Sequence, residues 1–260
     1  MVVPPEVMDA AEAGNITVVR EWLESGGDPN DRSITGRSNA LIAALAGPDE
    51  ISEAHVDVVR LLIARGADVN CGASDGFAPL HCCTVYPEYS SYGPIIGLLL
   101  EAGANVHATT SDGETPLGMA LDCSIWSGPD ESESRACLDM VTRLLRAGAA
   151  LDLVQRNDVT AEKLLLQEEE RLRLVEVELT SHFYACKALV SDLRAAGSWK
   201  SYVRATPKEL LRLRSLIARG RAREKKRLRA KTPREIALLF APTFPNELFW
   251  NVATYWNPRS

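Results

Sequence analysis

Residues 58–70 read VVRLLIARGADVN, and close copies of this phrase recur along the chain. Residues 95–107 read IIGLLLEAGANVH, residues 141–152 read VTRLLRAGAALD, and a divergent copy, VVREWLESGGDPN, occupies residues 18–30. The apolar spacing is that of an amphipathic helix, and the glycine in each copy is typical of a left-handed helix cap. The predicted caps are Gly26, Gly66, Gly103 and Gly148.

A second phrase follows two of these helices after a short gap. Residues 75–81 read DGFAPLH, and residues 112–117 read DGETPL. The Asp-Gly pair favours a tight turn, because glycine adopts positive φ without steric cost. Thr115 can cap the next helix with its hydroxyl, and Pro116 fits the first helical position, where no N–H donor is needed. The pattern predicts a turn and a second helix in each repeat.

Together these phrases resemble the ankyrin repeat, a β-turn followed by two antiparallel helices. The resemblance covers residues 3–165 and implies an all-α ankyrin-repeat solenoid of four repeats and part of a fifth. We expect a C-terminal helical extension, divided into a long capping helix at 166–197 and a basic helical module at 198–260. Stacked repeats present a concave face, and in this family partner proteins lie against the turn tips and inner helices.

The turn tips therefore supply the first set of candidate binding residues. Phe77 is the chief anchor candidate, because an exposed aromatic side chain favours an interface; the alternative is packing against a neighbouring tip. The tip residues that the resemblance selects are Arg32, Thr35, Ser74, Phe77, Thr110 and Glu114.

Insertions supply a second set. The cap glycines are 66 − 26 = 40, 103 − 66 = 37 and 148 − 103 = 45 residues apart, against about 33 in the family. The extra residues fall between the two helices of a repeat, where longer loops add little closure entropy. They are either drift in tolerant loops or partner-contacting loops, and the second interpretation selects Tyr89, Tyr92 and Trp126.

His81 ends a Pro-Leu-His motif, where the family uses the imidazole to tie neighbouring repeats together. A zinc site with Cys71, Cys82 and Cys83 is not expected, because adjacent helical residues point about 100° apart and no second cysteine pair has zinc-site spacing. The sequence carries no phosphate-binding loop and no nucleophile motif. We expect a non-catalytic protein without a metal or cofactor.

Apolar residues continue at heptad spacing after Thr160. This seam predicts a long helix that docks on the last repeat, with a free coiled coil as the alternative. The seam residues are Leu165, Leu172, Val175, Leu179, Cys186, Leu189 and Leu193.

The charge of the chain is strongly asymmetric. Residues 200–234 carry fourteen basic and two acidic residues, a net charge of 14 − 2 = +12, so the rest of the chain carries −6 − 12 = −18. A basic segment of this kind is typical of nucleic-acid binding or nuclear import. The alternative is a solvated helix face, or a strip that meets the acidic repeats.

Aromatic residues concentrate close to the last residues of the sequence. The run Phe244-Pro245-x-Glu247-Leu248, followed by an apolar segment, resembles the opening of F-box and SOCS-box type modules. Such modules lie C-terminal to ankyrin repeats in some substrate receptors of ubiquitin ligases. The alternative is packing onto the preceding helices. The predicted docking residues are Phe244, Leu248, Phe249 and Trp250.

Targeting signals and cysteine usage indicate the compartment. Residues 1–12 lack a basic region followed by an apolar run, and no apolar stretch approaches the roughly 20 residues of a membrane span. The six cysteines are scattered and interpreted as reduced thiols, so we expect a cytoplasmic or nuclear protein. The leading hypothesis is an adaptor that binds one protein on its concave face and docks to a second, such as a ubiquitin-ligase component, through its C-terminus. The alternative is a nuclear or nucleic-acid-associated regulator that uses residues 200–234.

Overall fold

The computed structural model describes residues 2–46, 51–73, 75–85, 92–126, 131–152, 159–174 and 179–203. The chain divides into two compact units, Met1–Arg194 and Ala195–Ser260. The larger unit is helical. Arg32 makes two isolated β-bridges, one with Val2 and one with Asn39.

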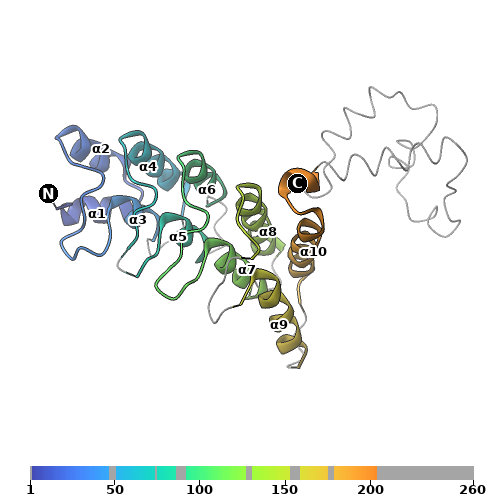
Figure 1. Cartoon of the computed structure of the whole chain (residues 1–260). Helices are drawn as coiled ribbons and strands as arrows, with labels where there is room; N and C mark the ends of the chain where they lie inside the picture. Colours follow the sequence, from blue (N-terminus) through green and yellow to red (C-terminus); the bar gives the residue numbers. More distant parts are fainter. Residues whose placement is uncertain are drawn as a thin grey trace, which may run out of the picture. The chain divides into compact units, whose positions relative to one another are not determined.

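The helices come in successive pairs (Figure 1). Helices α1, α3, α5, α7 and α9 contact one another in series and form an inner row, while α2, α4, α6 and α8 form an outer row. This arrangement is the predicted stack of helix pairs. The pairs are α1 (Pro5–Glu12) with α2 (Ile16–Glu24), α3 (Ala40–Leu45) with α4 (Glu53–Ala64), α5 (Pro79–Val85) with α6 (Tyr92–Glu101), α7 (Pro116–Trp126) with α8 (Glu131–Arg146), and α9 (Ala161–Leu174) with α10 (Ser181–Ala196).

The core lies between the two rows. All six residues of α3 are buried, and the repeated phrase supplies the facing side chains of the outer helices. Leu62, Leu99 and Leu144 occupy the same position of three copies, and each is 0% exposed. Burying one such leucine stabilises the fold by about 1.5–3 kcal/mol.

The predicted helix caps are present. After α4 the N–H of Ala67 donates to the carbonyl of Leu62 at 3.0 Å, and the same bond recurs after α6 and α8. The hydroxyl of Thr115 accepts the N–H of Gly118 at 3.1 Å, which confirms the predicted cap of α7. The four predicted cap glycines all lie in the left-handed region: Gly26, Gly66, Gly103 and Gly148, with φ of 96°, 87°, 88° and 98°.

The long helix predicted at 166–197 is divided in the structure. Residues 161–174 form α9, and α10 begins only at Ser181. The hydroxyl of Thr180 accepts the N–H of Phe183 at 3.2 Å, so a fresh N-cap begins the second helix. Helix α9 packs against α7 and extends the inner row, which is the docked arrangement and not a free coiled coil. The described seam residues that are buried are Leu165, Leu172, Cys186, Leu189 and Leu193.

The described part of the smaller unit is a short helical turn at residues 199–203. The hydroxyl of Ser198 accepts the N–H of Ser201 at 3.1 Å and begins the turn. The rings of Trp199 and Tyr202 lie with centroids 5.4 Å apart. Most of the predicted basic module, and all of residues 204–260, lies outside the described residues.

Candidate functional site

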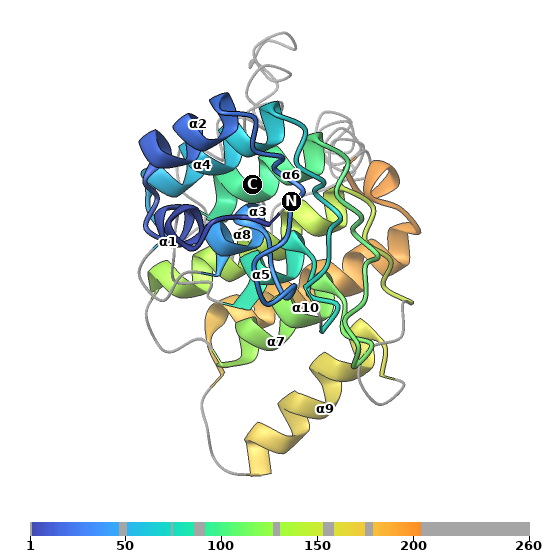
Figure 2. The same ribbon diagram turned by 90° about the vertical axis from the view of Figure 1, so that its left-hand side faces the viewer.

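The loops between successive helix pairs end in three similar turns, which we call tip 1 (residues 33–37), tip 2 (73–77) and tip 3 (110–114). Backbone hydrogen bonds close each turn. In tip 2 the N–H of Ala73 donates to the carbonyl of Phe77 at 2.9 Å, and in tip 3 the N–H of Thr110 donates to that of Glu114 at 3.0 Å. The loops run side by side along one flank of the larger unit (Figure 2).

Neighbouring tips are tied to one another. The guanidinium of Arg32 donates to the carbonyl of Gly72 at 3.1 Å, which joins the first loop to the second. The N–H of Ser111 donates to the carbonyl of Asp75 at 2.9 Å, which joins tip 3 to tip 2. A Cβ at position 76 would lie 2.9 Å from the nitrogen of Ser111, so the close approach of these two tips requires Gly76. The three tips therefore form one connected surface.

Two asparagines strengthen this connection farther back in the loops. Asn30 accepts the N–H of Asp68 at 2.7 Å and donates to the carbonyl of Gly66 at 3.0 Å. Asn70 repeats the arrangement one loop later, with the N–H of Asn105 at 2.7 Å and the carbonyl of Gly103 at 3.2 Å. Each amide satisfies a donor and an acceptor of the next loop at once.

His81 makes the inter-repeat tie that the sequence analysis expected. Its Nδ1 accepts the N–H of Ala78 at 3.0 Å, and its Nε2 lies 3.2 Å from the carbonyl oxygen of Glu114 in the next loop. A carbonyl oxygen only accepts, so the ring is neutral with the proton on Nε2. Burial lowers the pKa of His81, which favours that neutral form. Both ring nitrogens of His81 are therefore occupied, and the Nε2 contact joins two neighbouring repeats.

The cysteines beside His81 are buried thiols. Burial raises the pKa of Cys82 to about 12 and raises that of Cys83 as well, which disfavours the thiolate that a metal needs. No group of three or more His, Cys, Asp or Glu side chains in the described ranges is arranged to hold a metal ion. In the same ranges, no helix has the length and apolar character to cross a membrane.

Four of the predicted tip residues keep surface access. Arg32 and Thr35 are exposed, and Phe77 and Glu114 are half-buried. The ring of Phe77 lies 5.8 Å from the ring of His81, so part of the aromatic side chain packs onto its own repeat. This contact lies within one repeat and not between neighbouring tips, and the role of Phe77 as a binding anchor stays a prediction.

The sequence analysis missed the most exposed apolar residue of this surface. Ile34 in tip 1 is 76% exposed, and Val2, whose strand-like segment pairs with Arg32, is 53% exposed. The equivalent positions of tips 2 and 3 are Ser74 and Ser111, so alignment of the loops would have shown an isoleucine in place of a serine. The surface thus carries its most exposed apolar residue in tip 1.

Two predicted binding residues are buried. Thr110 is 6% exposed, and its hydroxyl accepts the N–H of Glu114 at 3.2 Å inside the turn. Tyr92 is 2% exposed and begins α6, and its hydroxyl donates to the carbonyl of Leu45 at 2.9 Å. Their expected exposure was wrong, because each polar group is satisfied within the fold.

The other predicted residues are beyond what the structure describes. Ser74 and Tyr89 fall between described ranges, and Trp126 ends α7 without a described side chain. The predicted C-terminal docking residues also lie outside the described ranges: Phe244, Leu248, Phe249 and Trp250.

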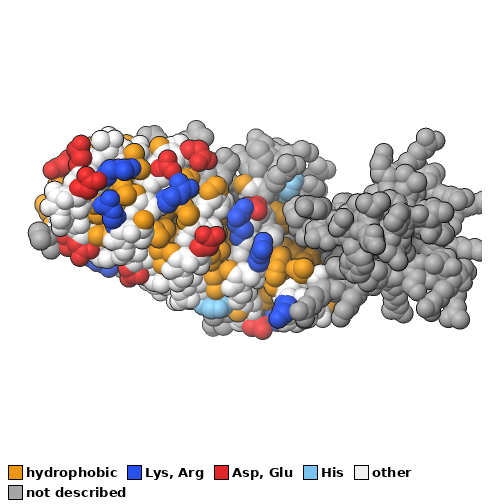
Figure 3. All heavy atoms as spheres, turned by 90° about the horizontal axis from the view of Figure 1, so that it is seen from above, with side chains coloured by type: hydrophobic (Ala, Val, Ile, Leu, Met, Phe, Trp, Pro, Cys, Tyr) orange, Lys and Arg blue, Asp and Glu red, His pale blue; other side chains and the backbone are white. Residues whose placement is uncertain are grey.

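The opposite side of the larger unit has a different character. Seen from above, the face of the outer helices mixes hydrophobic, basic and acidic side chains (Figure 3). Several of its charges are paired within one helix, as Arg60 is with Asp57 at 2.6 Å. Isolated exposed pairs of this kind add little stability, typically below about 1 kcal/mol.

Comparison with known proteins places the repeats in a family. A family model for ankyrin repeats matches residues 7–110 in three copies. RelA-associated inhibitor of Mus musculus is 35% identical over 79 residues, which is 29% of this chain and 8% of the relative. An ankyrin repeat-containing protein of Schizosaccharomyces pombe is 33% identical over 79 residues, or 30% of this chain and 35% of the relative. The matches therefore span only a minor part of each relative.

Proposed function

Because residues 7–110 are ankyrin repeats within an all-α solenoid, we propose that this chain is a non-catalytic adaptor that binds a partner protein on tips 1–3. Ankyrin repeats are protein-interaction modules. The name of the mouse relative, RelA-associated inhibitor, states such an association for that protein. The relative's partner does not carry over to the present chain, because side chains on the tips select the partner and the fold does not.

The observation that carries this proposal is Ile34. It is 76% exposed on a turn whose neighbour Arg32 is hydrogen-bonded to the next loop. An apolar side chain on an ordered backbone loses little conformational freedom on binding, so its burial contributes directly to affinity. Phe77 in tip 2 supplies a second, partly buried anchor of the aromatic kind that is enriched among hot-spot residues of interfaces.

The finer proposal is that the C-terminal segment recruits a second protein. Its support is the resemblance of residues 244–250 to the opening of F-box and SOCS-box type modules. A partner on the tips would then be a substrate that the chain presents to a ubiquitin ligase. A chain of this type acts in the cytoplasm or the nucleus.

The alternative function rests on the charge of residues 200–234, which is +12. A segment of this charge releases counterions when it binds nucleic acid, so its affinity would fall steeply with salt. This alternative predicts a nuclear or nucleic-acid-associated regulator, in which the repeats recruit a protein to the bound nucleic acid.

The test is affinity capture with the full chain as bait. The double variant Ile34→Ser, Phe77→Ser should lose the tip-bound partner, because both anchors become polar. Leu166→Ser is the matched control, since Leu166 is 55% exposed on α9, away from the tips. Capture that is lost in the double variant and kept in the control supports the adaptor. Equal capture by all three baits contradicts binding at the tips.

A second pair of baits separates the finer proposals. Phe249→Ser with Trp250→Ser should lose Skp1-like, elongin-like or cullin proteins and keep the tip-bound partner. Retention of these proteins, or their absence from the unmodified bait, contradicts ligase recruitment. RNA or DNA binding that weakens steeply with salt would favour the alternative function.

A further inference from the structure

The position four residues after each cap glycine is used differently along the solenoid. It is occupied by Asn30, Asn70, His107 and Asp152 in the four copies of the repeated phrase. The first two side chains each make two hydrogen bonds to the following loop. The loops of the first three helix pairs are therefore joined by four side-chain bonds at one position.

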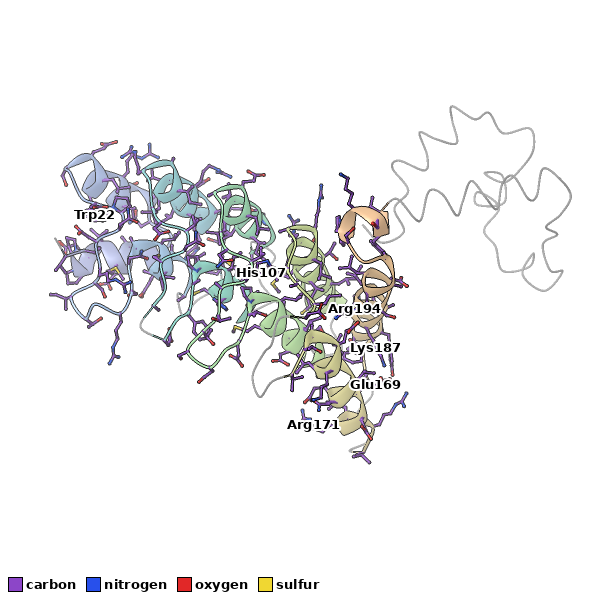
Figure 4. All side chains as sticks on the ribbon, in the orientation of Figure 1. Trp22, His107, Glu169, Arg171, Lys187 and Arg194 are labelled. Atoms are coloured by element: carbon purple, nitrogen blue, oxygen red, sulfur yellow. The ribbon has the colours of Figure 1, made fainter. Side chains whose placement is uncertain are left out.

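This ladder stops at His107. Among the described residues, the imidazole of His107 makes neither of the bonds that Asn30 and Asn70 make, although its own N–H donates to Asn105 as in the earlier loops. His107, which Figure 4 labels, lies in the loop that follows α6. The donor and the acceptor of a neutral imidazole lie on different sides of the ring, whereas the oxygen and the NH2 of an amide are attached to the same carbon.

The next loop nevertheless offers the same partners. Gly148 has φ of 98°, and the N–H of Ala149 donates to the carbonyl of Leu144 at 3.0 Å, as Ala67 does to Leu62. The carbonyl of Gly148 and the N–H of Ala150 thus occupy the places of the groups that Asn30 and Asn70 bind. The missing link is a property of residue 107 and not of the fourth loop.

In the fourth copy the residue at this position is Asp152, and it makes an ion pair with the last helix pair. Asp152 pairs with Arg194 of α10 at 2.6 Å, and Arg194 also makes two bonds to Glu162 of α9, at 3.1 and 3.0 Å. Lys187 of α10 bonds to Glu169 of α9 (Figure 4). The Asp152 contact ties the residues after α8 to the last helix pair, and the other contacts join α9 to α10 within that pair.

The outer helices stay in contact at this point, with an arginine in place of a leucine. Arg143 of α8 stands where α4 and α6 carry Leu61 and Leu98. Its guanidinium lies over the glycines of α6, with Nη1 3.9 Å from a Cβ built at Gly97. Arg143 is bonded to Asp139 of its own helix at 2.6 Å, so an intrahelical ion pair covers the glycine face. On the inner side the link persists, because the thiol of Cys123 donates to the carbonyl of Thr84 at 2.8 Å.

From these contacts we propose that the boundary between the third and fourth helix pairs is a built-in breakpoint. Helices α1–α6 form a first block and α7–α10 a second block, and the two open as separate cooperative units. The contacts of α5 with α7 and of α6 with α8 keep the blocks attached while the loop side separates. In a repeat protein, the coupling between neighbours decides whether the array opens as a whole or in parts. The proposal concerns the solenoid itself and stands whichever partner the tips bind.

The test is hydrogen exchange of individual amides, measured by NMR on the full chain. In the unmodified protein the N–H of Ala150 should exchange faster than those of Asp68 and Asn105. His107→Asn should restore the ladder and slow the exchange of Ala150 about tenfold, the effect of one to two net hydrogen bonds. It should also raise the hydrogen-exchange protection of amides in the second block towards that of amides in the first block.

The mirror variant is Asn70→His, which moves the gap one loop earlier. It should speed the exchange of Asn105 about tenfold and leave Ala150 unchanged. The proposal is overturned if Ala150 in the unmodified protein is as protected as Asp68 and Asn105. It is equally overturned if His107→Asn leaves both Ala150 and the second block at their original exchange rates.

Discussion

The first block and the second block are built from the same repeated phrase but are held together by different contacts. In the first block, amide side chains and His81 bind backbone groups of the next repeat. In the second block, Arg194 and Lys187 reach acidic side chains of α9 and its preceding loop. The side chain at one position of each repeat therefore decides which tie that position adds between neighbouring loops.

The two kinds of tie respond differently to solution conditions. Bonds between neutral groups are little affected by salt, whereas ion pairs on exposed side chains are screened over about 8–10 Å at physiological ionic strength. High salt should therefore weaken the ion pairs of the second block and leave the hydrogen bonds between the loops of the first block in place. The following predictions test this contrast, beginning with the largest expected effect.

Removing one core leucine from each block should show whether the blocks open separately. Leu62→Ala and Leu144→Ala each delete a side chain that is 0% exposed, at an expected loss of about 2–5 kcal/mol. The first should lower hydrogen-exchange protection mainly in α1–α6, and the second mainly in α7–α10. A uniform loss of protection along the chain from either variant would mean a single block.

In the first repeat, two contacting residues differ together from their counterparts in the later copies. Trp22 stands where later copies have leucine, and a Cβ at Gly27 would lie 2.2 Å from its ring, where the later copies have alanine. Gly27→Ala should destabilise the chain by about 1–3 kcal/mol through overpacking. The double variant with Trp22→Leu restores the pair Leu62–Ala67 found in the next copy and should recover much of the loss.

The double-mutant cycle in urea denaturation measures this coupling. A Gly27→Ala variant as stable as the parent chain would contradict the steric account. A double variant no more stable than the single one would show that the indole, and not the clash, holds the terminal repeat.

Acid should weaken the first block through His81. Burial lowers its pKa in the folded chain below the ordinary 6.5, so the unfolded chain takes up the proton first as pH falls. The contribution to stability is full above about pH 7.5 and declines as the pH drops through 6.5 towards the folded pKa, by at most about 1.4 kcal/mol per pH unit. Thermal unfolding from pH 8 to pH 5 measures the slope.

Replacing the ring of His81 provides the control for this pH dependence. His81→Gln should flatten the slope. A slope that survives His81→Gln unchanged assigns the effect to other groups.

The smallest effect is expected at Arg194. Arg194→Ala removes both acidic contacts, but the arginine side chain is 40% exposed and Asp152 is 77% exposed. Such pairs are weak and are screened by salt. Melting curves in low salt should show a small loss of stability that disappears in 0.5–1 M NaCl, on the order of the salt needed to shorten the screening length to a few ångströms. A loss of the same size at high salt would mean that packing of the arginine stem, and not charge, is responsible.

The sequence predicts those parts of this fold that depend on local chemistry. The cap glycines need positive φ, and Thr115 needs only its own helix to act as a cap, so both are visible in a short window. His81 was predicted through the family motif. The division between α9 and α10 was not, because the apolar spacing continues through it and the Thr180 cap resembles any other polar residue in a helix.

The parts that sequence reasoning missed depend on residues far apart in the chain. Tyr92 belongs to an apparent insertion, and only its bond to Leu45, 47 positions away, makes it a core residue. Arg194 and Asp152 share no motif. Ile34 was missed for a different reason: its signal is local, but it appears only when the three tips are aligned with one another.

The most direct test of the two-block account is native-state hydrogen exchange of the unmodified full chain in increasing, sub-denaturing urea. We expect the amides of α7–α10 to converge on one opening free energy and those of α3–α6 to converge on a higher one. Convergence of all these amides on a single opening free energy would contradict the breakpoint at His107.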